Sequence, residues 1–279
     1  MAGRQPAGEN DRQWYEKYWA GFRGVLELQL SLHLQTRRPL LRLLERHLPS
    51  DRPVRFLEVG CGTALDTCLL ASQRPAARAV ALDLSREAVG VARRNAGALR
   101  LPVATLAADL TALPFAANRF DLVFSQGVLE HFRDPDPAIC EQLRVLCPGG
   151  VLVVDVPQKF NLYTLRKRRA MHEGRWAWGW ETEYSAGDLR RWAARFGLTV
   201  CGMAGHDHGR WLDRILIHPH RTLRNRWHRR NGQPASVYHP GPVARAWESV
   251  WDWLDARIGP FLAINIAVAF RKLPMDQEP

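Results

Sequence analysis

Short apolar runs alternate along the middle of the chain with segments in which apolar residues recur at helical spacing. Continuous runs of this length are typical of strands that are buried on both faces. They cover residues 54–59, 77–83, 103–109, 120–126 and 151–157. Because helical segments separate them, the pattern predicts βαβ units and an α/β fold, with a parallel sheet between two helical layers.

Capping residues and helix breakers mark the ends of the predicted helices. We expect helices over 63–72, from Ser85 to residue 98, and over 134–146. Ser85 is a favourable N-cap because its hydroxyl oxygen can accept from a backbone N–H of the first turn. Pro148-Gly149-Gly150 ends the third helix. In such sheets ligands bind at the carboxyl ends of the strands, where we expect the functional site.

The segments on either side of this alternation are less regular. Apolar spacing over 14–48 predicts two helices that are separated near Arg38-Pro39. After residue 157 the pattern predicts a helix over 185–197, with Ser185 as its N-cap. Two further strands are expected over 198–204 and 261–272.

These patterns divide the chain into three expected parts. A helical cap comprises residues 1–50, a ligand-binding core comprises 51–157, and a substrate or lid region comprises 158–279. The last part contains a basic, tryptophan-rich helical insertion, 205–259, and ends in the strand that completes the sheet.

The composition is that of a soluble globular protein, with 46% hydrophobic and 24% charged residues among 279. The N-terminal residues lack the apolar core of a signal peptide, and the longest apolar stretch, 261–270, is far shorter than the ~20 residues of a membrane helix. Five cysteines include no C-x-x-C pair, which disfavours disulfides and a zinc site and favours a reducing compartment. We therefore expect a cytoplasmic protein.

The net charge of +11 is concentrated in one part of the chain. Residues 157–230 contain sixteen Lys and Arg but only six Asp and Glu. Such a segment attracts phosphates, nucleic acid or an anionic membrane surface. The tryptophans and arginines of the insertion are compatible with peripheral membrane contact, a dimer interface or a solvated basic face, so the oligomeric state stays open.

A Gly60-x-Gly62 turn after the first strand can bring the backbone close to a ligand. A nicotinamide-binding turn would have a third glycine where this chain has Leu65. A phosphate loop of the Walker type would have Gly-Lys-Ser/Thr, which the sequence lacks. The turn therefore satisfies neither nucleotide pattern.

Three acidic residues at the predicted strand ends point to a different ligand. Glu58 precedes the turn, Asp83 ends the second strand and Asp109 ends the third. A carboxylate at Asp83 can accept from both hydroxyls of a ribose, and Asp109 can accept from the amine of an adenine. This set suits an adenosine without a pyrophosphate and so indicates S-adenosylmethionine (SAM). Taken singly, each acid is also compatible with ordinary turn chemistry.

Six motifs occur in order along the chain: Glu58–Ala64, Ala81–Ser85, Ala108–Leu110, Phe120–Ser125, Val128–His131 and Leu146–Gly150. With them, residues 54–157, and more loosely 14–272, resemble class I SAM-dependent methyltransferases of the UbiE-like, methyltransferase domain 11 type. The resemblance implies a Rossmann-like fold: a seven-stranded, mostly parallel sheet with helices on both faces and an antiparallel last strand. Ala64 departs from the family pattern, in which a third glycine is usual.

The resemblance also implies the roles of individual residues. Residues of the glycine turn would hold the amino-acid end of SAM, Asp83 the ribose, and Asp109 the adenine. The expected cofactor-binding residues are Glu58, Gly60, Cys61, Gly62, Asp83, Leu84, Asp109, Leu110, Ser125 and Gln126. The N-terminal helix, with Trp14, Tyr15, Tyr18 and Trp19, is expected to close over the cofactor.

The acceptor side carries fewer motifs. His131, just after the fourth strand, is the candidate catalytic base, and a packing or cofactor-side role is also compatible with its position. Trp176, Trp178 and Tyr184 are candidate substrate-binding residues, because an aromatic wall suits planar, prenyl-bearing or cationic substrates. The same residues are compatible with covering one edge of the sheet. His206-Asp207-His208 offers too few ligands for a metal, so none is expected.

The residues after the fourth strand, SQGV, lack the motifs of enzymes that methylate nucleic-acid bases. We therefore predict methyl transfer from SAM to a small-molecule acceptor, with O-methylation favoured over C- and N-methylation. A lipid-, quinone- or glycan-like acceptor of anionic or aromatic character fits the basic, aromatic lid. Two alternatives stay open: an RNA-directed methyltransferase, and a non-catalytic SAM-binding regulatory or scaffold protein.

Overall fold

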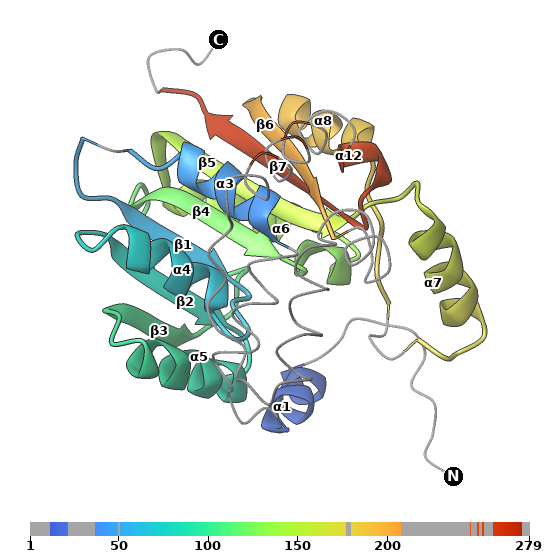
Figure 1. Cartoon of the computed structure of the whole chain (residues 1–279), viewed down its shortest axis with the longest axis horizontal. Helices are drawn as coiled ribbons and strands as arrows, with labels where there is room; N and C mark the ends of the chain where they lie inside the picture. Colours follow the sequence, from blue (N-terminus) through green and yellow to red (C-terminus); the bar gives the residue numbers. More distant parts are fainter. Residues whose placement is uncertain are drawn as a thin grey trace.

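The computed structural model describes residues 12–21, 37–49, 51–176, 180–207 and 259–274, together with residues 246, 250 and 253. Within these residues the chain forms a seven-stranded sheet in the order β3-β2-β1-β4-β5-β7-β6 (Figure 1). The strands are β1 (Arg55–Val59), β2 (Arg78–Asp83), β3 (Val103–Ala107), β4 (Phe120–Gln126), β5 (Leu146–Pro157), β6 (Leu198–His206) and β7 (Asn265–Lys272). Each apolar run predicted as a strand contains one, although residues 261–264 of the run 261–272 precede β7.

Most neighbouring strands run parallel. β1 pairs with β2 and β4, β2 pairs with β3, and β4 pairs with β5, all in parallel. β7 runs antiparallel to both neighbours, so that Val268 lies opposite Val154 of β5 and Met203 of β6. The predicted mostly parallel sheet with an antiparallel last strand is thereby confirmed. The strand order reverses between β1 and β4, where α/β sheets open a crevice for ligands.

Helices cover both faces of this sheet (Figure 1). On one face lie α3 (Arg38–Arg46), α4 (Leu65–Gln73) and α5 (Arg86–Ala98), and on the other lie α6 (Asp136–Val145) and α8 (Ala186–Arg195). Phe56 and Phe124 are buried with Leu44 of α3, whereas Val154 is buried with Leu189 of α8. Further elements are α1 (Arg12–Ala20), the 3-10 helix η1 (Leu129–His131), α7 (Leu162–His172) and α12 (Gly259–Leu262). Among the described residues, no helix is long and apolar enough to cross a membrane.

The predicted caps explain where several helices begin. The Ser85 side chain accepts from the backbone N–H of Ala88 at 3.2 Å. Ser185 and Asp188 form a reciprocal capping box at the start of α8. α3 begins at Arg38-Pro39, because a proline in the first turn lacks only an N–H that would have no partner there.

Three features differ from the sequence-based expectation. α4 begins at Leu65 rather than at residue 63, because Ala64 adopts the left-handed backbone conformation, with φ +53°. β5 begins at Leu146, so that Pro148-Gly149-Gly150 lies within a strand, where its pairing with β4 is irregular. α7 was not expected, since the basic run 166–169 obscures its apolar pattern. Most of the 205–259 insertion and the middle of 14–48 lie outside the described residues.

Candidate functional site

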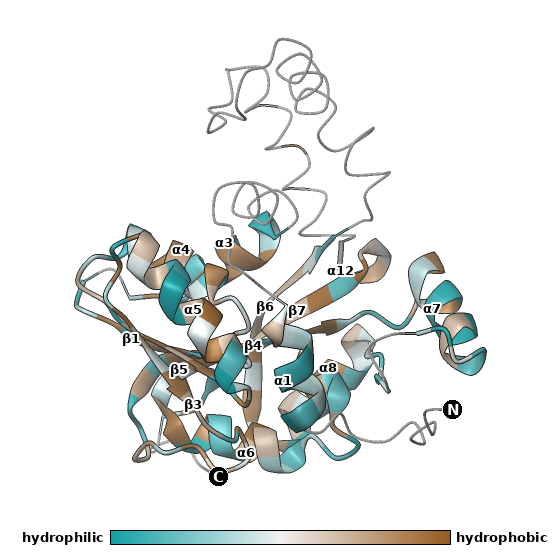
Figure 2. Cartoon of the chain, turned by 90° about the horizontal axis from the view of Figure 1, so that it is seen from below, coloured by the Kyte–Doolittle hydropathy of each residue, from teal (hydrophilic) through white to brown (hydrophobic). Residues whose placement is uncertain are grey.

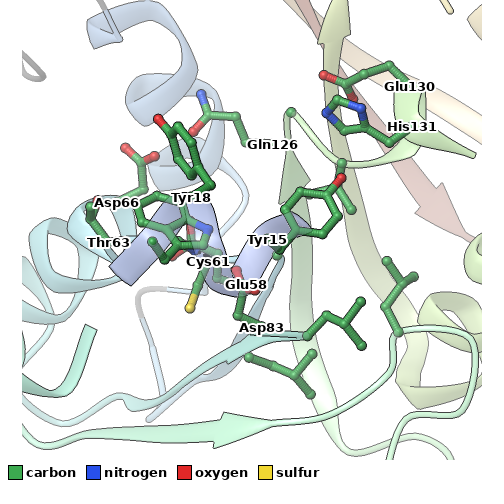
Figure 3. A pocket seen from close by; sticks show the side chains of 18 of the residues that line it. Tyr15, Tyr18, Glu58, Cys61, Thr63, Asp66, Asp83, Gln126, Glu130 and His131 are labelled. Atoms are coloured by element: carbon green, nitrogen blue, oxygen red, sulfur yellow. Dashed lines mark hydrogen bonds between the residues drawn. The ribbon is translucent and has the colours of Figure 1, made fainter. Parts of the chain in front are cut away.

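A cavity of about 450 Å³ lies at the carboxyl ends of the central strands (Figure 3). Most of the predicted cofactor residues and the predicted base line it: Glu58, Gly60, Cys61, Gly62, Asp83, Leu84, Asp109, Leu110, Gln126 and His131. Other lining residues come from α1, from the start of α4 and from the segment before α8: Trp14, Tyr15, Tyr18, Trp19, Asp66 and Glu181. The fold thus gathers one site from parts of the chain that are far apart in the sequence.

The glycine turn after β1 forms one wall of the cavity. Gly60 and Gly62 have φ values of +69° and +49°, a region that strongly favours glycine. A Cβ on Gly60 would lie 2.3 Å from Val128 Cγ2, and one on Gly62 would lie 2.7 Å from the ring of Trp19. A side chain at either position would therefore clash with the segment after β4 or with α1. The packing and the backbone conformation both require glycine. Ala64 takes the same left-handed conformation with a Cβ present, which is a strained arrangement.

Asp83, at the end of β2, is held in a fixed orientation by the backbone. Its Oδ2 accepts from Gly62 N–H at 2.9 Å and its Oδ1 accepts from Ser85 N–H at 2.9 Å. Burial raises the pKa of this carboxyl, and the two backbone N–H groups oppose that rise. Each oxygen keeps a second lone pair, so the side chain can accept from two further donors such as the hydroxyls of a ribose.

Glu58, near the end of β1, is a buried carboxyl at the base of the cavity. Its Oε2 accepts from Thr67 twice, from the hydroxyl at 2.6 Å and from the backbone N–H at 3.2 Å. Burial, and then the neighbouring Asp66, raise the pKa of Glu58 to about 8. The carboxyl is therefore largely protonated at neutral pH, and a cation placed beside it would favour loss of that proton.

Asp109 combines a position in the cavity wall with a local structural role. Its Oδ1 accepts from both the backbone N–H and the hydroxyl of Thr111, each at 2.8 Å. This is the turn chemistry that the sequence left open for the residue. Leu110, which follows it, is buried and also faces the cavity.

Helix α1 covers the cavity with aromatic side chains, and Figure 3 shows Tyr15 and Tyr18 over it. Glu16, on the same helix, binds the N-terminus of α5. Its carboxylate accepts from the Ser85 hydroxyl at 2.7 Å and from the backbone N–H groups of Arg86 and Glu87 at 2.8 and 3.0 Å. Although burial opposes the change, these hydrogen bonds lower the pKa of Glu16 below its ordinary value. The carboxylate of Glu16 thus fixes α1 over the cavity.

His131 lies on the opposite side of the cavity, in η1. Its Nδ1 is 3.3 Å from the carbonyl oxygen of Trp180. Because a carbonyl only accepts, Nδ1 carries the hydrogen, and Nε2 keeps its lone pair. Burial lowers the pKa of His131, and nearby Glu181 partly offsets this effect. The ring is therefore neutral at pH 7 and able to accept a proton.

Within the described residues, two buried polar groups of the cavity lining lack hydrogen-bond partners. They are Oε2 of Glu130 and Nε2 of Gln126. Glu130 is 4% exposed, and burial raises its pKa well above the ordinary range, so that it is a neutral acid. Sequence reasoning assigned Glu130 no role. Its position next to His131 in the VLEH motif was the signal that could have found it.

A buried lysine holds the segment that carries Trp180 and Glu181. Lys167 of α7 is 2% exposed, and its Nζ lies 2.9 Å from Glu181 Oε2 and 3.1 Å from Glu183 Oε1. A buried cation between two carboxylates fixes both, since separating them would leave charges without partners. The lysine therefore positions one edge of the cavity.

Several candidate residues lie away from the cavity lining. Ser125 is buried within β4, and its hydroxyl has no partner. Trp176 turns toward α7, where its ring contacts Tyr163 and its Nε1 donates to Glu181 at 3.2 Å. Tyr184 is buried against Trp192, with ring centroids 4.8 Å apart. It therefore packs in the hydrophobic core beside α8, while Trp178 lies outside the described residues.

The described residues include only part of the His206-Asp207-His208 cluster that begins at the end of β6. His206 is buried, and its Nε2 lies 2.9 Å from Asp155 Oδ1. His208 lies outside the described residues. In the part of the chain that the structure describes, no group of three or more His, Cys, Asp or Glu side chains is arranged to hold a metal ion.

Comparisons with known proteins agree with this arrangement. A family model described as a methyltransferase domain matches residues 57–154. A malonyl-[acyl-carrier protein] O-methyltransferase from Dechloromonas aromatica is 31% identical over 200 residues, which cover 71% of this chain and 69% of that protein. The chain belongs to the class I SAM-dependent methyltransferase family. SAM is therefore the cofactor of this methyltransferase, as the strand-end acids indicated.

Other matches differ in how much of each protein they cover. A demethylmenaquinone methyltransferase from Thermus thermophilus is 39% identical over 102 residues, which cover 37% of this chain and 46% of that one. The methyltransferase spans about half the length of several curated relatives, this one included. A solved structure of geranyl diphosphate C-methyltransferase from Streptomyces coelicolor has the same fold, with a TM-score of 0.59 at 14% identity over 98% of this chain and 100% of that chain.

Proposed function

We propose that the methyltransferase transfers the methyl group of SAM to a hydroxyl oxygen of a small-molecule acceptor, with His131 as the general base. One observation carries the proposal: a single cavity joins the carboxyls of Glu58 and Asp83 to the ring of His131. In Figure 3 the two carboxyls lie on the side formed by β1 and β2, and His131 lies on the side formed by the segment after β4.

The residues on the first side fit the cofactor. Glu58 is a buried carboxyl whose pKa stays raised despite the charge of nearby Arg37, and the ammonium group of a methionine would favour its ionised form. Asp83 offers two oriented acceptors for ribose hydroxyls, and Asp109 with Leu110 extends the wall toward an adenine. When bound, SAM would supply a methyl group on a sulfonium, which an attacking oxygen would receive as S-adenosylhomocysteine leaves.

The residues on the second side fit the activation of a hydroxyl. Nε2 of His131 can take the proton of an acceptor hydroxyl as its oxygen becomes the nucleophile. A neutral ring is required for this step, and burial keeps His131 neutral. The O-methyltransferase among the relatives supports oxygen as the methylated atom.

Cofactor binding is tested by thermal unfolding with saturating SAM, S-adenosylhomocysteine, NAD or NADP added separately. At about 100 times its Kd a ligand stabilises by about 2.7 kcal/mol, which raises Tm by a few degrees. We expect the two SAM-type ligands alone to do so, and Asp83→Ala to abolish the shift. Asp51→Ala removes an exposed carboxyl as the matched control. Stabilisation by a nicotinamide, or by none of the four, would contradict the proposal.

The role of His131 is tested by His131→Asn in an assay of S-adenosylhomocysteine release with phenols, quinols, hydroxy acids and sugars as acceptors. The asparagine amide can still donate to the Trp180 carbonyl but has no lone pair on nitrogen to accept a proton. We expect kcat to fall by about 10²–10⁴ with unchanged SAM affinity. A variant with wild-type kcat would exclude His131 as the base.

A further inference from the structure

Large apolar side chains lie exposed on the outer side of α7, away from the cavity. Leu162 is 74% exposed, Leu165 is 59% exposed, and Phe160, just before the helix, is 68% exposed. In both overall views α7 stands at the edge of the molecule, apart from the helices that cover the sheet (Figures 1 and 2). Single exposed apolar residues are common, but several neighbouring ones mark an interaction surface.

A second element contributes to this surface and fixes its shape. Phe261 of α12 is 55% exposed. Buried Gln158 joins the two elements: its Nε2 donates to the carbonyls of Pro260 and Phe261 at 3.0 and 3.2 Å, and its Oε1 accepts from Phe160 N–H. The N-cap of α7, Asn161, donates to Ala263 O at 3.0 Å. We call Phe160, Leu162, Leu165 and Phe261 the α7 platform, since a buried polar network holds their backbones together.

Basic side chains border the α7 platform. Lys159 Nζ lies 5.8 Å from the ring centroid of Phe160. Arg166 and Arg169 are exposed and follow Leu162 and Leu165 on the same side of α7, at helical spacings of three and four. Between residues 159 and 175 the only acidic residue is Glu173, so the border carries excess positive charge. Exposed apolar side chains beside cations are the composition that binds anionic lipid surfaces.

We propose that the α7 platform docks the methyltransferase on an anionic lipid bilayer, with its apolar side chains at the acyl boundary and the border cations at the headgroups. Two-fold pairing of two copies through this surface would instead bring like-charged borders together, in a chain of net charge +11. The surface also connects to the cavity edge, since Tyr163 of α7 contacts Trp176, which donates to Glu181. The inference concerns a surface outside the cavity and does not rest on the proposed reaction.

Flotation of the full chain with vesicles tests this docking. One set of vesicles is phosphatidylcholine, and the other contains equal parts of phosphatidylcholine and phosphatidylglycerol. We expect binding to the anionic vesicles alone, weakened by salt. The double variant Leu162→Ser/Leu165→Ser should bind about tenfold more weakly or worse, and Arg166→Glu about fivefold more weakly or worse.

Leu106→Ser is the matched control, because Leu106 is 37% exposed on β3, at the opposite edge of the sheet. Its binding should equal that of the wild type. Unchanged Tm and an unchanged Tm shift with SAM show that each variant is folded. The inference is overturned if the wild type binds neither kind of vesicle or both kinds equally, or if the double variant binds like the wild type. It is also overturned if sedimentation shows a dimer that the double variant abolishes, since a second copy would then occupy the surface.

Discussion

Single residues of this site owe their chemistry to burial as much as to their own functional groups. Glu58 shows this most clearly, because burial and Asp66 raise its pKa from 4.5 to about 8. Between these two pH values the folded chain holds a proton that the unfolded chain has lost. The stability that this proton contributes is complete below pH 4.5 and is lost as the pH rises through about 8.

Glu58→Gln is expected to separate stability from binding. The amide oxygen can still accept from Thr67, but no proton has to be lost at alkaline pH. In the absence of ligand, Tm of the variant should exceed that of the wild type above pH 8 and approach it at pH 5, while SAM binding weakens. Calorimetric titration at pH 7 in buffers of different ionisation enthalpy should show release of about one proton by the wild type and none by the variant. Parallel curves of Tm against pH for the wild type and the variant would contradict this account.

Elements with small buried surfaces depend on a few directed contacts for their position. Helix α1 has no fully buried residue, yet its aromatic side chains line the cavity. At the N-terminus of α5, Glu16 accepts from the Ser85 hydroxyl and from the backbone N–H groups of Arg86 and Glu87, two donors that a helix leaves unpaired. A carboxylate there is further favoured by the helix dipole.

Glu16→Ala should therefore loosen α1 without unfolding the core. Loss of a capping interaction of about 1 kcal/mol corresponds to SAM binding weakened by roughly fivefold, with Tm of the free chain nearly unchanged. Lys17→Ala is the control, because Lys17 is exposed on the same helix. Titration calorimetry with SAM gives both affinities. Equal weakening by the two variants would show that helix propensity, rather than the Glu16 contacts, sets the affinity.

Across the whole molecule, the two ends of the parallel strands carry different roles. The carboxyl ends surround the cavity. At the amino end of β4, Asp121 accepts from Arg52 Nη2 and from Arg55 N–H, each at 2.8 Å. Burial opposes these hydrogen bonds, but together they lower the pKa of Asp121. This group contributes stability above the ordinary aspartate pKa and loses it as the pH falls through the lowered value.

Asp121→Asn is expected to reduce stability but not SAM affinity, whereas Asp83→Asn is expected to reduce SAM affinity. Asp121→Asn should reduce the free energy of unfolding by about 1–3 kcal/mol at pH 7, with SAM affinity within about twofold. The difference should shrink as the pH falls through the lowered pKa of Asp121. Asp83→Asn should weaken SAM binding by about tenfold or more, because one charge-assisted acceptor is lost. Urea unfolding and calorimetric titration measure the two quantities. Loss of SAM affinity in Asp121→Asn would show that the two ends are coupled.

The amino-acid sequence alone predicted the α/β alternation, the caps at Ser85 and Ser185 and the acids at the strand ends. These features depend on residues close together in the chain, since a strand, a cap and a strand-end turn are local. Even the antiparallel last strand was expected from the family resemblance, and β7 confirms it. α7 escaped prediction because four consecutive basic residues mask its pattern.

Contacts between distant segments could not be predicted from the sequence. Three such contacts join distant residues. His131 and Trp180 are 49 positions apart, Glu16 and Ser85 are 69 apart, and Gln158 and Pro260 are 102 apart. Spacing along a chain carries no information about such pairs, because the path of the intervening elements sets which side chains meet. For the same reason Tyr184 and Trp176, which were expected to face a substrate, pack against α8 and α7, whereas the aromatic residues of α1 line the cavity. Sequence determined which chemistry the chain carries, and packing among remote segments determined where it acts.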